Sequence, residues 1–441
     1  MLSTVDTDRT QLAAMFTRVR GVTQRLVAPL LAEDWRVQSM PDVSPPYWNL
    51  GHTSWFFPRN VLAPAGLDTV GDFPGFDYAF NSYYDGLGPR LLRERRGLVA
   101  QPSTAQTLEY RAAVDAAMQR AIANCGPAQW PAFAECARIG LQHEQQHQEL
   151  FLTEILHIRW SAPRELRLPY ARPLAAAAGG GRGSDRLRAV EVGSALVPIG
   201  HQDGGFCWDN ELPVHRAAIA AGAIADRLVT NREWFGFVDD GGYQRPLLWL
   251  SNGWDHVQRT RLQAPLYWEH RDGRWTRFSL RGEAPVDLDA PVSHVSFYEA
   301  DAFARWYGEQ FTDWRGARLP REHEWEHAAR SVGFATSSAN LLDDDPSASA
   351  LDARAARAAN GVRQLAGDLW EWTQSHYEPY PGYRPFAGAL MEYNGKFMDN
   401  QRVLRGGSFA TPRDHARVAY RNFWPPQTRF QATGIRLWVD R

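Results

Sequence analysis

Three stretches in the first half of the chain carry apolar residues at helical spacing and contain few helix-breaking residues. They cover residues 8–33, 104–124 and 130–160. No Gly or Pro lies between Leu141 and Ala162, which strengthens the third pattern. The segment SPPYWNLGHTSWFF (residues 44–57) is bounded by prolines and rich in aromatic residues, and it is a candidate for a further helix. This half of the chain is therefore predicted to form a helical bundle.

The second half has a different pattern, in which short strand-like runs alternate with turn-rich stretches. SALVPIG and RVLRGGSF are such runs, and TNREWFGFVDD and SFYEADAFARWYGEQ are the two helical pieces. Between the halves, AAAAGGGRGSDR is small and lacks apolar periodicity. We therefore predict an α+β protein with a helical domain (1–174), a linker or exposed loop (175–186) and a second, mixed domain (187–441).

Composition narrows the class of protein. The 48 basic and 50 acidic residues leave a net charge of -2, which gives no electrostatic case for a nucleic-acid or anionic-membrane partner. The three cysteines are too few and too scattered for a disulfide framework or a zinc cluster. The N-terminus lacks a basic segment followed by an apolar one, and no run of about 18 apolar residues occurs. We expect a cytoplasmic protein without membrane association; its oligomeric state stays open, with a monomer among the options.

Two histidines in LQHEQQHQEL (residues 141–150) are spaced for metal binding. His143 and His147 are four residues apart, so both imidazoles lie on one helix face and reach one ion. Gln146 shares much of that face. A solvated polar face explains the same pattern, because such histidine pairs also arise by chance. A third ligand is needed to decide between the two interpretations.

His52 is the candidate third ligand. Metal sites in four-helix bundles are assembled from side chains on facing helices, so one histidine from the second helix and a pair from a later helix make a three-histidine face. Three neutral imidazoles with open positions suit Fe(II) or Zn(II) and leave room for substrate and dioxygen. Taken alone, His52 is more commonly a packed core histidine, and composition leaves both interpretations open.

Several motifs resemble one family over nearly the whole chain. GHTSWFF, FNSYYDGLGPR, HEQQHQE, EYNGKFMDNQRVLRGGSFATP and YRNFWPPQTRFQATGIRL resemble the ergothioneine-forming sulfoxide synthases and the related selenoneine synthases. VPIG, RLPREHEWEHAAR, LAGDLWEWTQS and LRGGSF resemble the formylglycine-generating-enzyme domain. The resemblance implies a DinB-like four-helix bundle with an iron site, followed by that domain, which is related to C-type lectins. The formylglycine enzymes use a cysteine pair near the C-terminus; no cysteine follows Cys207, so we do not expect their chemistry.

The resemblance also implies a reaction and its ligands. Fe(II) is the cofactor, dioxygen is a cosubstrate, and a new carbon-chalcogen bond forms at imidazole C2 of hercynine, the trimethylated betaine of histidine. The iron ligands fall on His52, His143 and His147, whereas Gln146 and Asn422 match positions that hold the hercynine imidazole.

Aromatic residues complete the expected site. Phe423 and Trp424 follow directly and suit a quaternary ammonium through cation-π contact, although core packing explains them equally well. A tyrosine phenol is the expected proton donor. Our first candidates are Tyr83 and Tyr84, and behind them come Tyr377 and Tyr393. A structural role explains each tyrosine nearly as well.

The chalcogen donor is where the chain departs from the family pattern. Arg90 and Arg93 match basic positions that hold the carboxylates of γ-glutamylcysteine in some members. In those members an Asp and an Arg further along grip the amino-acid end, whereas Trp424 and Thr428 stand at those places here, with Arg429 one position off.

The segment WNLGHTSWFFP also differs from the WHLAHTTWFFE form that is typical of ergothioneine enzymes, with Asn49, Gly51 and Pro58 as the departures. These losses favour a neutral selenosugar as donor and therefore selenoneine synthesis. Ergothioneine-type synthesis from cysteine or γ-glutamylcysteine is the alternative.

Three further hypotheses differ in class. An ovothiol-type synthase would usually carry an additional methyltransferase domain, and this chain ends at Arg441 without one. A zinc-dependent DinB-like thiol transferase would use the histidines but leave the second domain idle. A non-catalytic lectin-like protein would need a closed metal site, which normally has four protein ligands. His323 and His327 form another histidine pair, which we interpret as part of a solvated or capping helix face because of the charges around it.

Overall fold

The computed structural model describes residues 4–67, 70–172, 186–357 and 361–441. Residues 175–185 of the predicted linker lie outside this range. The chain forms two compact units. The helical unit comprises residues 1–171, 344–347 and 386–393, and the sheet unit comprises residues 172–343, 348–385 and 394–441. That the two domains meet at residue 174 stays a prediction.

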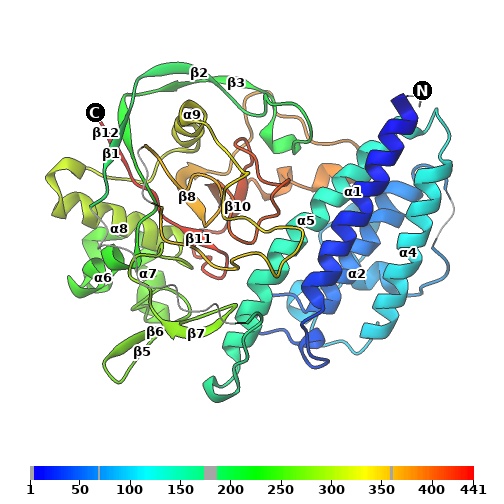
Figure 1. The fold of residues 1–441 in the computed structure, drawn as a ribbon, viewed down its shortest axis with the longest axis horizontal. Helices are drawn as coiled ribbons and strands as arrows, with labels where there is room; N and C mark the ends of the chain where they lie inside the picture. The colour runs from blue at the N-terminus through cyan, green and yellow to red at the C-terminus, as the bar shows by residue number, and fades with distance from the viewer. Residues whose placement is uncertain (1–3, 68–69, 173–185, 358–360) are drawn as a thin grey trace. The chain divides into compact units, whose positions relative to one another are not determined.

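Four long helices build the helical unit, and they lie side by side in Figure 1. They are α1 (Thr4–Val27), α2 (Pro46–Phe57), α4 (Thr104–Asn124) and α5 (Trp130–Ser161). A short helix, α3 (Phe76–Phe80), lies between α2 and α4 in the sequence. Ser103 and Gln106 form a reciprocal capping box at the start of α4. The first helix ends earlier than the predicted residue 33, because Pro29 disfavours helical backbone at the residue before it.

A buried ionic cluster ties three of these helices together. The Glu144 carboxylate of α5 accepts hydrogen bonds from Thr23 Oγ1 at 2.6 Å and Arg20 Nη1 at 2.8 Å, both on α1, and from Arg111 Nη2 of α4 at 2.7 Å. Burial raises the pKa of Glu144, but the charges of Arg111 and Arg20 outweigh it and leave the pKa at about 2. Glu144 is 0% exposed, so its ion pairs with the two arginines lie in the core and not on the helix surface.

Glu144→Gln should lower the free energy of unfolding by about 3–5 kcal/mol, because buried Arg111 loses its carboxylate partner and buried Arg20 keeps only Asp115. In the folded protein the pKa of Glu144 lies below its unfolded value of 4.5, so its contribution is present above that value and is lost as the pH falls through about 2. Urea unfolding at several pH values measures both effects. Asp344→Asn, which breaks the exposed pair with Arg18, is the control and should cost about 1 kcal/mol or less. An equal loss in the two variants would contradict the prediction.

In its described residues, the sheet unit contains four small sheets and four α-helices. The strands are β1 (Ala189–Val192), β2 (Ala195–Ile199), β3 (His215–Ile219), β4 (Gly222–Ala225), β5 (Trp268–Arg271), β6 (Arg274–Ser279), β7 (Gly282–Pro285), β8 (Trp370–His376), β9 (Arg402–Arg405), β10 (Asn422–Trp424), β11 (Thr433–Gly434) and β12 (Trp438–Asp440). The sheet orders are β1-β4-β12, β10-β9-β8-β11, β2-β3 and β5-β6-β7. All pairings are antiparallel except β8 with β11. The helices are α6 (Asn231–Asp239), α7 (Ser251–Thr260), α8 (Phe297–Gln310) and α9 (Glu322–Val332). This confirms the predicted α+β class.

Aromatic residues and buried ion pairs fill the core of the sheet unit. Trp325 and Trp372 are fully buried, and the Trp325 indole donates to the Glu371 carboxylate at 2.6 Å. After β9 the chain turns sharply at Gly406, where φ is +100° and a Cβ would lie 2.6 Å from a carbonyl oxygen. Only glycine fits there without strain.

The predicted solvated or capping helix face around His323 and His327 is confirmed as a cap but wrong for solvation of the neighbouring glutamates. The Glu324 carboxylate accepts from the backbone N–H of Arg321 at 2.7 Å, at the start of α9. Both histidines lie on α9, but Glu322 and Glu324 are buried. Arg421 pairs with Glu322 at 2.8 Å, and this pairing allows the carboxylate to leave water. No helix in the described part of the chain is both long and apolar enough to cross a membrane.

Candidate metal centre

Three histidines of the helical unit gather at one point. His52 comes from α2, and His143 and His147 come from successive turns of α5. One ring nitrogen from each lies within 4.8 Å of the others, and the Nε2 atoms of His52 and His143 are 3.1 Å apart. Among the described residues, no other group of three or more His, Cys, Asp or Glu side chains has this geometry. The structure thus brings together the three residues that the sequence singled out as ligands.

Small residues allow the two helices to approach. Gly140 lies one turn before His143 on α5, and a Cβ there would stand 2.7 Å from the Phe57 ring and 2.9 Å from the Phe56 ring of α2. Real Cβ atoms do not come so close, so any larger residue would push α2 away from α5. The distance between His52 and the α5 histidines therefore depends on this glycine.

Hydrogen bonds orient two of the three rings. His52 Nδ1 donates to the Phe80 carbonyl at 2.7 Å, and its ring stacks on Trp48 with centroids 4.6 Å apart. His147 Nδ1 lies 2.9 Å from Asn49 Oδ1, which can only accept. Both rings therefore direct an unprotonated Nε2 toward the same point, as metal-ligating histidines do.

The electrostatics suit a cation. Burial lowers the pKa of His143 to about 3, and it lowers the pKa of His52 and His147 well below the usual range, with neighbouring histidines adding to the effect on both. All three imidazoles are therefore neutral at physiological pH. The Nε2 atoms of His52 and His143 lie 3.1 Å apart, close enough for both to bind one cation when His143 carries its proton on Nδ1. Three neutral nitrogen donors fit Fe(II) or Zn(II).

Gly51, one of the departures from the ergothioneine form, supports the His52 side of the centre. A Cβ at Gly51 would stand 2.0–2.4 Å from the ring of Phe80, whose carbonyl holds His52. Gly51→Ala should displace Phe80, lower the free energy of unfolding by about 1–3 kcal/mol and weaken Co(II) binding.

Gly21→Ala is the matched control, because its Cβ would meet only the flexible end of Arg25 at 3.3 Å. Helix propensity makes that change neutral or stabilising by up to about 1 kcal/mol. Thermal unfolding and Co(II) titration of both variants measure the difference. Wild-type Co(II) affinity in Gly51→Ala would contradict the role assigned to Phe80.

Tyr393 lies beside the three histidines although it is far from them in sequence. Its segment, residues 386–393, belongs to the helical unit. The Tyr393 hydroxyl donates to Gln146 Oε1, and its ring centroid is 5.7 Å from that of His143, with the planes nearly perpendicular. The Glu392 carboxylate anchors the segment by accepting from the backbone N–H of Gly86 at 2.9 Å. Gln146 and Tyr393, which were predicted separately, are therefore in contact.

Tyr83 and Tyr84 lie behind Tyr393. The Tyr83 ring is 6.1 Å from the Tyr393 ring and stacks on Tyr84 at 4.7 Å. Tyr84 is 0% exposed and packs against Trp55 at 5.7 Å. Burial raises the pKa of both Tyr83 and Tyr84, so both phenols are neutral. Of the two tyrosines that the sequence placed first, Tyr83 is thus in ring contact with Tyr393, whereas Tyr84 contacts Tyr83 and Trp55.

Four of the predicted residues lie in the sheet unit, and their roles stay predictions. Asn422, Phe423 and Trp424 form β10. The Phe423 ring stacks on Tyr377 with centroids 4.0 Å apart, and the Tyr377 hydroxyl accepts from Asn210 at 2.8 Å. Burial raises the pKa of Tyr377 well above its usual value. Trp424 packs edge-on against an aromatic neighbour at 5.4 Å.

The two arginines predicted to bind the carboxylates of the chalcogen donor are at the surface. Arg90 pairs with Asp85 at 3.0 Å, and Arg93 is exposed. Sequence reasoning missed Arg96, which is buried, lies 3.2 Å above the Trp48 ring and donates to Ser44 and Ser82. Because Trp48 also stacks on His52, the guanidinium, indole and imidazole form one stack. In the sequence, the run RERRG (residues 93–97) shows only that charges cluster there. It does not indicate that Arg96 is the buried arginine.

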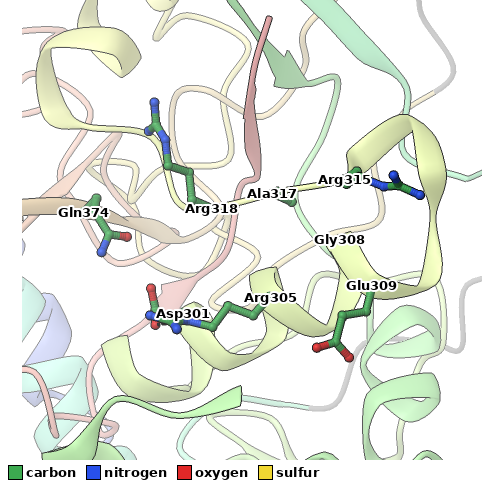
Figure 2. Close-up of a pocket in the computed structure, with 9 residues that line it drawn as sticks. Asp301, Arg305, Gly308, Glu309, Arg315, Ala317, Arg318 and Gln374 are labelled. Atoms are coloured by element: carbon green, nitrogen blue, oxygen red, sulfur yellow. Dashed lines mark hydrogen bonds and ion pairs between the residues drawn. The ribbon is translucent and has the colours of Figure 1, made fainter. Parts of the chain in front are cut away.

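A separate cavity of about 650 Å³ opens within the sheet unit (Figure 2). It is lined by Asp301, Arg305, Gly308, Glu309, Arg315, Gly316, Ala317, Arg318 and Gln374. Arg305 pairs with Asp301 on the same helix at 3.0 Å, and Arg318 pairs with Glu324 at 2.7 Å. None of its lining residues was predicted as a site residue, and none is a histidine or cysteine. Its charges are largely matched within the protein.

Comparison with known proteins agrees with this architecture. The DinB superfamily matches residues 15–151, and the sulfatase-modifying factor enzyme 1-like domain matches residues 184–441. Hercynine oxygenase of Mycolicibacterium thermoresistibile is 33% identical and covers 98% of this chain and 96% of its own length. Hercynine oxygenase of Mycobacterium tuberculosis is also 33% identical, over 98% of this chain and 99% of its own. That of Mycolicibacterium smegmatis is 36% identical over 68% of this chain and 70% of its own. The chain therefore belongs to the hercynine oxygenase family, in which a DinB-type helical region precedes a sulfatase-modifying-factor-type domain.

Proposed function

We propose that this protein is a nonheme Fe(II), O2-dependent synthase that forms a carbon-selenium bond at imidazole C2 of hercynine, with a selenosugar as donor. The observation that carries this proposal is the group of three neutral histidines, whose ring nitrogens lie within 4.8 Å of one another. It occurs in a chain that aligns with proteins named hercynine oxygenase over nearly its whole length.

His52, His143 and His147 would hold the iron. A closed structural site normally has four protein ligands, whereas the described residues supply three, which leaves positions for substrates. Bound Fe(II) would supply the redox chemistry with dioxygen. Zn(II) suits the same ligands but has no redox chemistry, so metal identity separates this proposal from a thiol transferase.

Gln146 would orient the hercynine imidazole. Its Oε1 accepts from the Tyr393 hydroxyl. A carboxamide also carries an NH2 donor, which is the kind of group that can hydrogen-bond an imidazole nitrogen. A neutral amide can orient the ring without changing its charge. Asn422 of β10 is the second residue that the family pattern assigns to this task.

Tyr393 is our proposed proton donor, ahead of Tyr83 and Tyr84, because it contacts Gln146 and packs on His143. In the overall reaction, C2–H of hercynine and Se–H of the donor are replaced by C2–Se, and dioxygen takes the two electrons and two protons to become hydrogen peroxide. If the selenium is also oxidised, one oxygen atom ends in the selenoxide and the other in water. A phenol beside the reacting centre can deliver a proton during this reduction.

The residues at the positions that bind γ-glutamylcysteine in other members favour an uncharged chalcogen donor. Arg429, one position from the arginine of the γ-glutamylcysteine-binding members, lies 3.0 Å from the Glu299 carboxylate and also donates to a backbone carbonyl. Arg90 is paired with Asp85. Trp424 and Thr428 carry no charge. Ergothioneine-type synthesis from cysteine or γ-glutamylcysteine is the alternative, supported by exposed Arg93, which could bind a carboxylate.

Oxygen uptake tests the proposal. The protein is loaded anaerobically with Fe(II), given hercynine, and supplied separately with selenoglucose, cysteine or γ-glutamylcysteine, with Zn(II)-loaded protein as control. Uptake with selenoglucose alone supports selenoneine synthesis, and turnover with either thiol moves the assignment to ergothioneine-type synthesis. No uptake with any donor would overturn the proposed reaction.

A further inference from the structure

A chain of hydrogen bonds runs from His147 to a buried carboxylate two helical turns away. His147 Nδ1 lies 2.9 Å from Asn49 Oδ1, and Asn49 Nδ2 donates to Glu154 Oε2 at 2.6 Å. The other carboxylate oxygen, Glu154 Oε1, accepts from the backbone N–H of Ser44 at 2.8 Å. Asn49 and Glu154 are each 4% exposed. Water therefore cannot easily replace any bond in this chain.

The direction of each bond is fixed by chemistry. A carboxylate only accepts, so Asn49 must turn its NH2 group toward Glu154 and its carbonyl oxygen toward His147. That oxygen also only accepts, so the His147 proton must sit on Nδ1. The lone pair is then on Nε2, the nitrogen that faces the other two histidines.

We infer that Glu154 is a positioning residue that acts through Asn49 to hold His147 in the tautomer that can bind metal. This inference rests on the proposed metal centre, and it assigns a role to Asn49, one of the departures from the ergothioneine form. Partners of this kind on ligating histidines typically change metal affinity by about 10–100-fold when removed.

The Glu154 carboxyl acts only as an acceptor once it is ionised. Burial raises the pKa of Glu154 to about 7, while Ser44, Asn49 and the charges of Arg93 and Arg96 act in the opposite direction. Arg96 donates to the Ser44 hydroxyl at 2.9 Å, so one serine bridges the buried guanidinium and the carboxylate. Above that pKa the carboxylate is ionised, and the experiment below is performed there.

Glu154→Gln tests the inference without leaving any group unpaired. The backbone N–H of Ser44 remains a donor, so the new carboxamide at position 154 must accept from it and present its NH2 group to Asn49. Asn49 then turns its oxygen to position 154 and its NH2 group to His147. His147 Nδ1 becomes an acceptor, and its proton moves to Nε2, where it blocks metal binding.

The double variant Asn49→Asp, Glu154→Gln should reverse this change. The new carboxylate at position 49 accepts from both His147 Nδ1 and the amide at position 154, so the original tautomer returns with every partner satisfied. Asp115→Asn is the matched control. It makes the same carboxylate-to-carboxamide change in the helical unit, at a residue paired with Arg20 rather than joined to a ligand histidine.

Two measurements on the full chain read out the result. Nitrogen-15 NMR of labelled histidine reports the His147 tautomer in metal-free protein, and Co(II) titration reports affinity. We expect the other tautomer and an affinity loss of about 10–100-fold in Glu154→Gln, restoration of both in the double variant, and no change in Asp115→Asn.

A folded Glu154→Gln with the wild-type tautomer and affinity would overturn the inference. If that variant does not fold, a folded double variant with the blocked tautomer would overturn it equally. A failure of the proposed function gives a different result from a failure of this inference. The wild-type protein would then show the expected His147 tautomer but bind neither Co(II) nor Fe(II).

Discussion

Replacing His143 or His147 with alanine is expected to abolish iron binding and hercynine-dependent oxygen uptake while the helical unit stays folded. Each substitution removes one of only three protein ligands in the described site. Both side chains are neutral in the folded protein, so their loss leaves no buried charge unpaired. The expected fall in stability is that of a cavity in the core, about 2–5 kcal/mol. Metal analysis after reconstitution and circular dichroism measure the two properties separately.

The matched control is His157→Gln, which changes a buried histidine on the same helix. His157 Nδ1 is hydrogen-bonded to Ser39 at 2.7 Å and lies outside the three-histidine group. This variant should bind iron as the wild type does. Full activity in either the His143 or the His147 variant would contradict the three-histidine centre.

Tyr393→Phe is expected to lower kcat by about 10²–10⁴-fold, the range typical of a lost general acid. Iron affinity should change little, because the ring still packs on His143. The KM for hercynine should rise, because Gln146 loses the hydroxyl that its amide oxygen contacts. Stopped-flow oxygen consumption and steady-state kinetics separate kcat from KM.

Two tyrosine controls make that result specific. Tyr83→Phe removes a hydroxyl one ring further from His143, and Tyr377→Phe removes the bond with Asn210 in the sheet unit. Tyr377→Phe should cost about 1 kcal/mol of stability. A kcat loss in Tyr83→Phe that matches or exceeds the loss in Tyr393→Phe would move the proton donor to Tyr83.

Local pattern was sufficient to predict the helices that carry the ligands. The i, i+4 spacing of His143 and His147 already places both on one face of α5, and Pro46 marks the first residue of α2. The helical and strand-like patterns in the second half also agree with α6, α8, β2 and β9. These elements follow from residues close together in the sequence, which is the information that periodicity contains.

Contacts between distant segments were not accessible in this way. Tyr393 and Gln146 are 247 residues apart, and no periodicity connects them. Glu154 follows His147 by seven residues and so shares its helix face, which is a signal the sequence does contain. However, its function depends on Asn49 from another helix, and this partner is visible only in the structure.

The departures from the ergothioneine form have structural counterparts around the site. Asn49 joins His147 to Glu154, and Gly51 makes room for the ring of Phe80. Pro58 begins a single π-helical turn, Pro58–Leu62, directly after α2. In the sequence these residues appeared only as losses relative to one subfamily. In the structure, Asn49 and Gly51 support the orientation of two candidate ligands.

The most direct test of the proposed reaction uses hercynine that carries deuterium at imidazole C2. Fe(II)-loaded protein is mixed with this substrate, dioxygen and selenoglucose, and the product is analysed by mass spectrometry. The account predicts a selenium-containing product that has lost the deuterium, because the new bond replaces C2–H. A selenium adduct that retains the deuterium, or oxygen uptake with unmodified hercynine recovered in full, would contradict it.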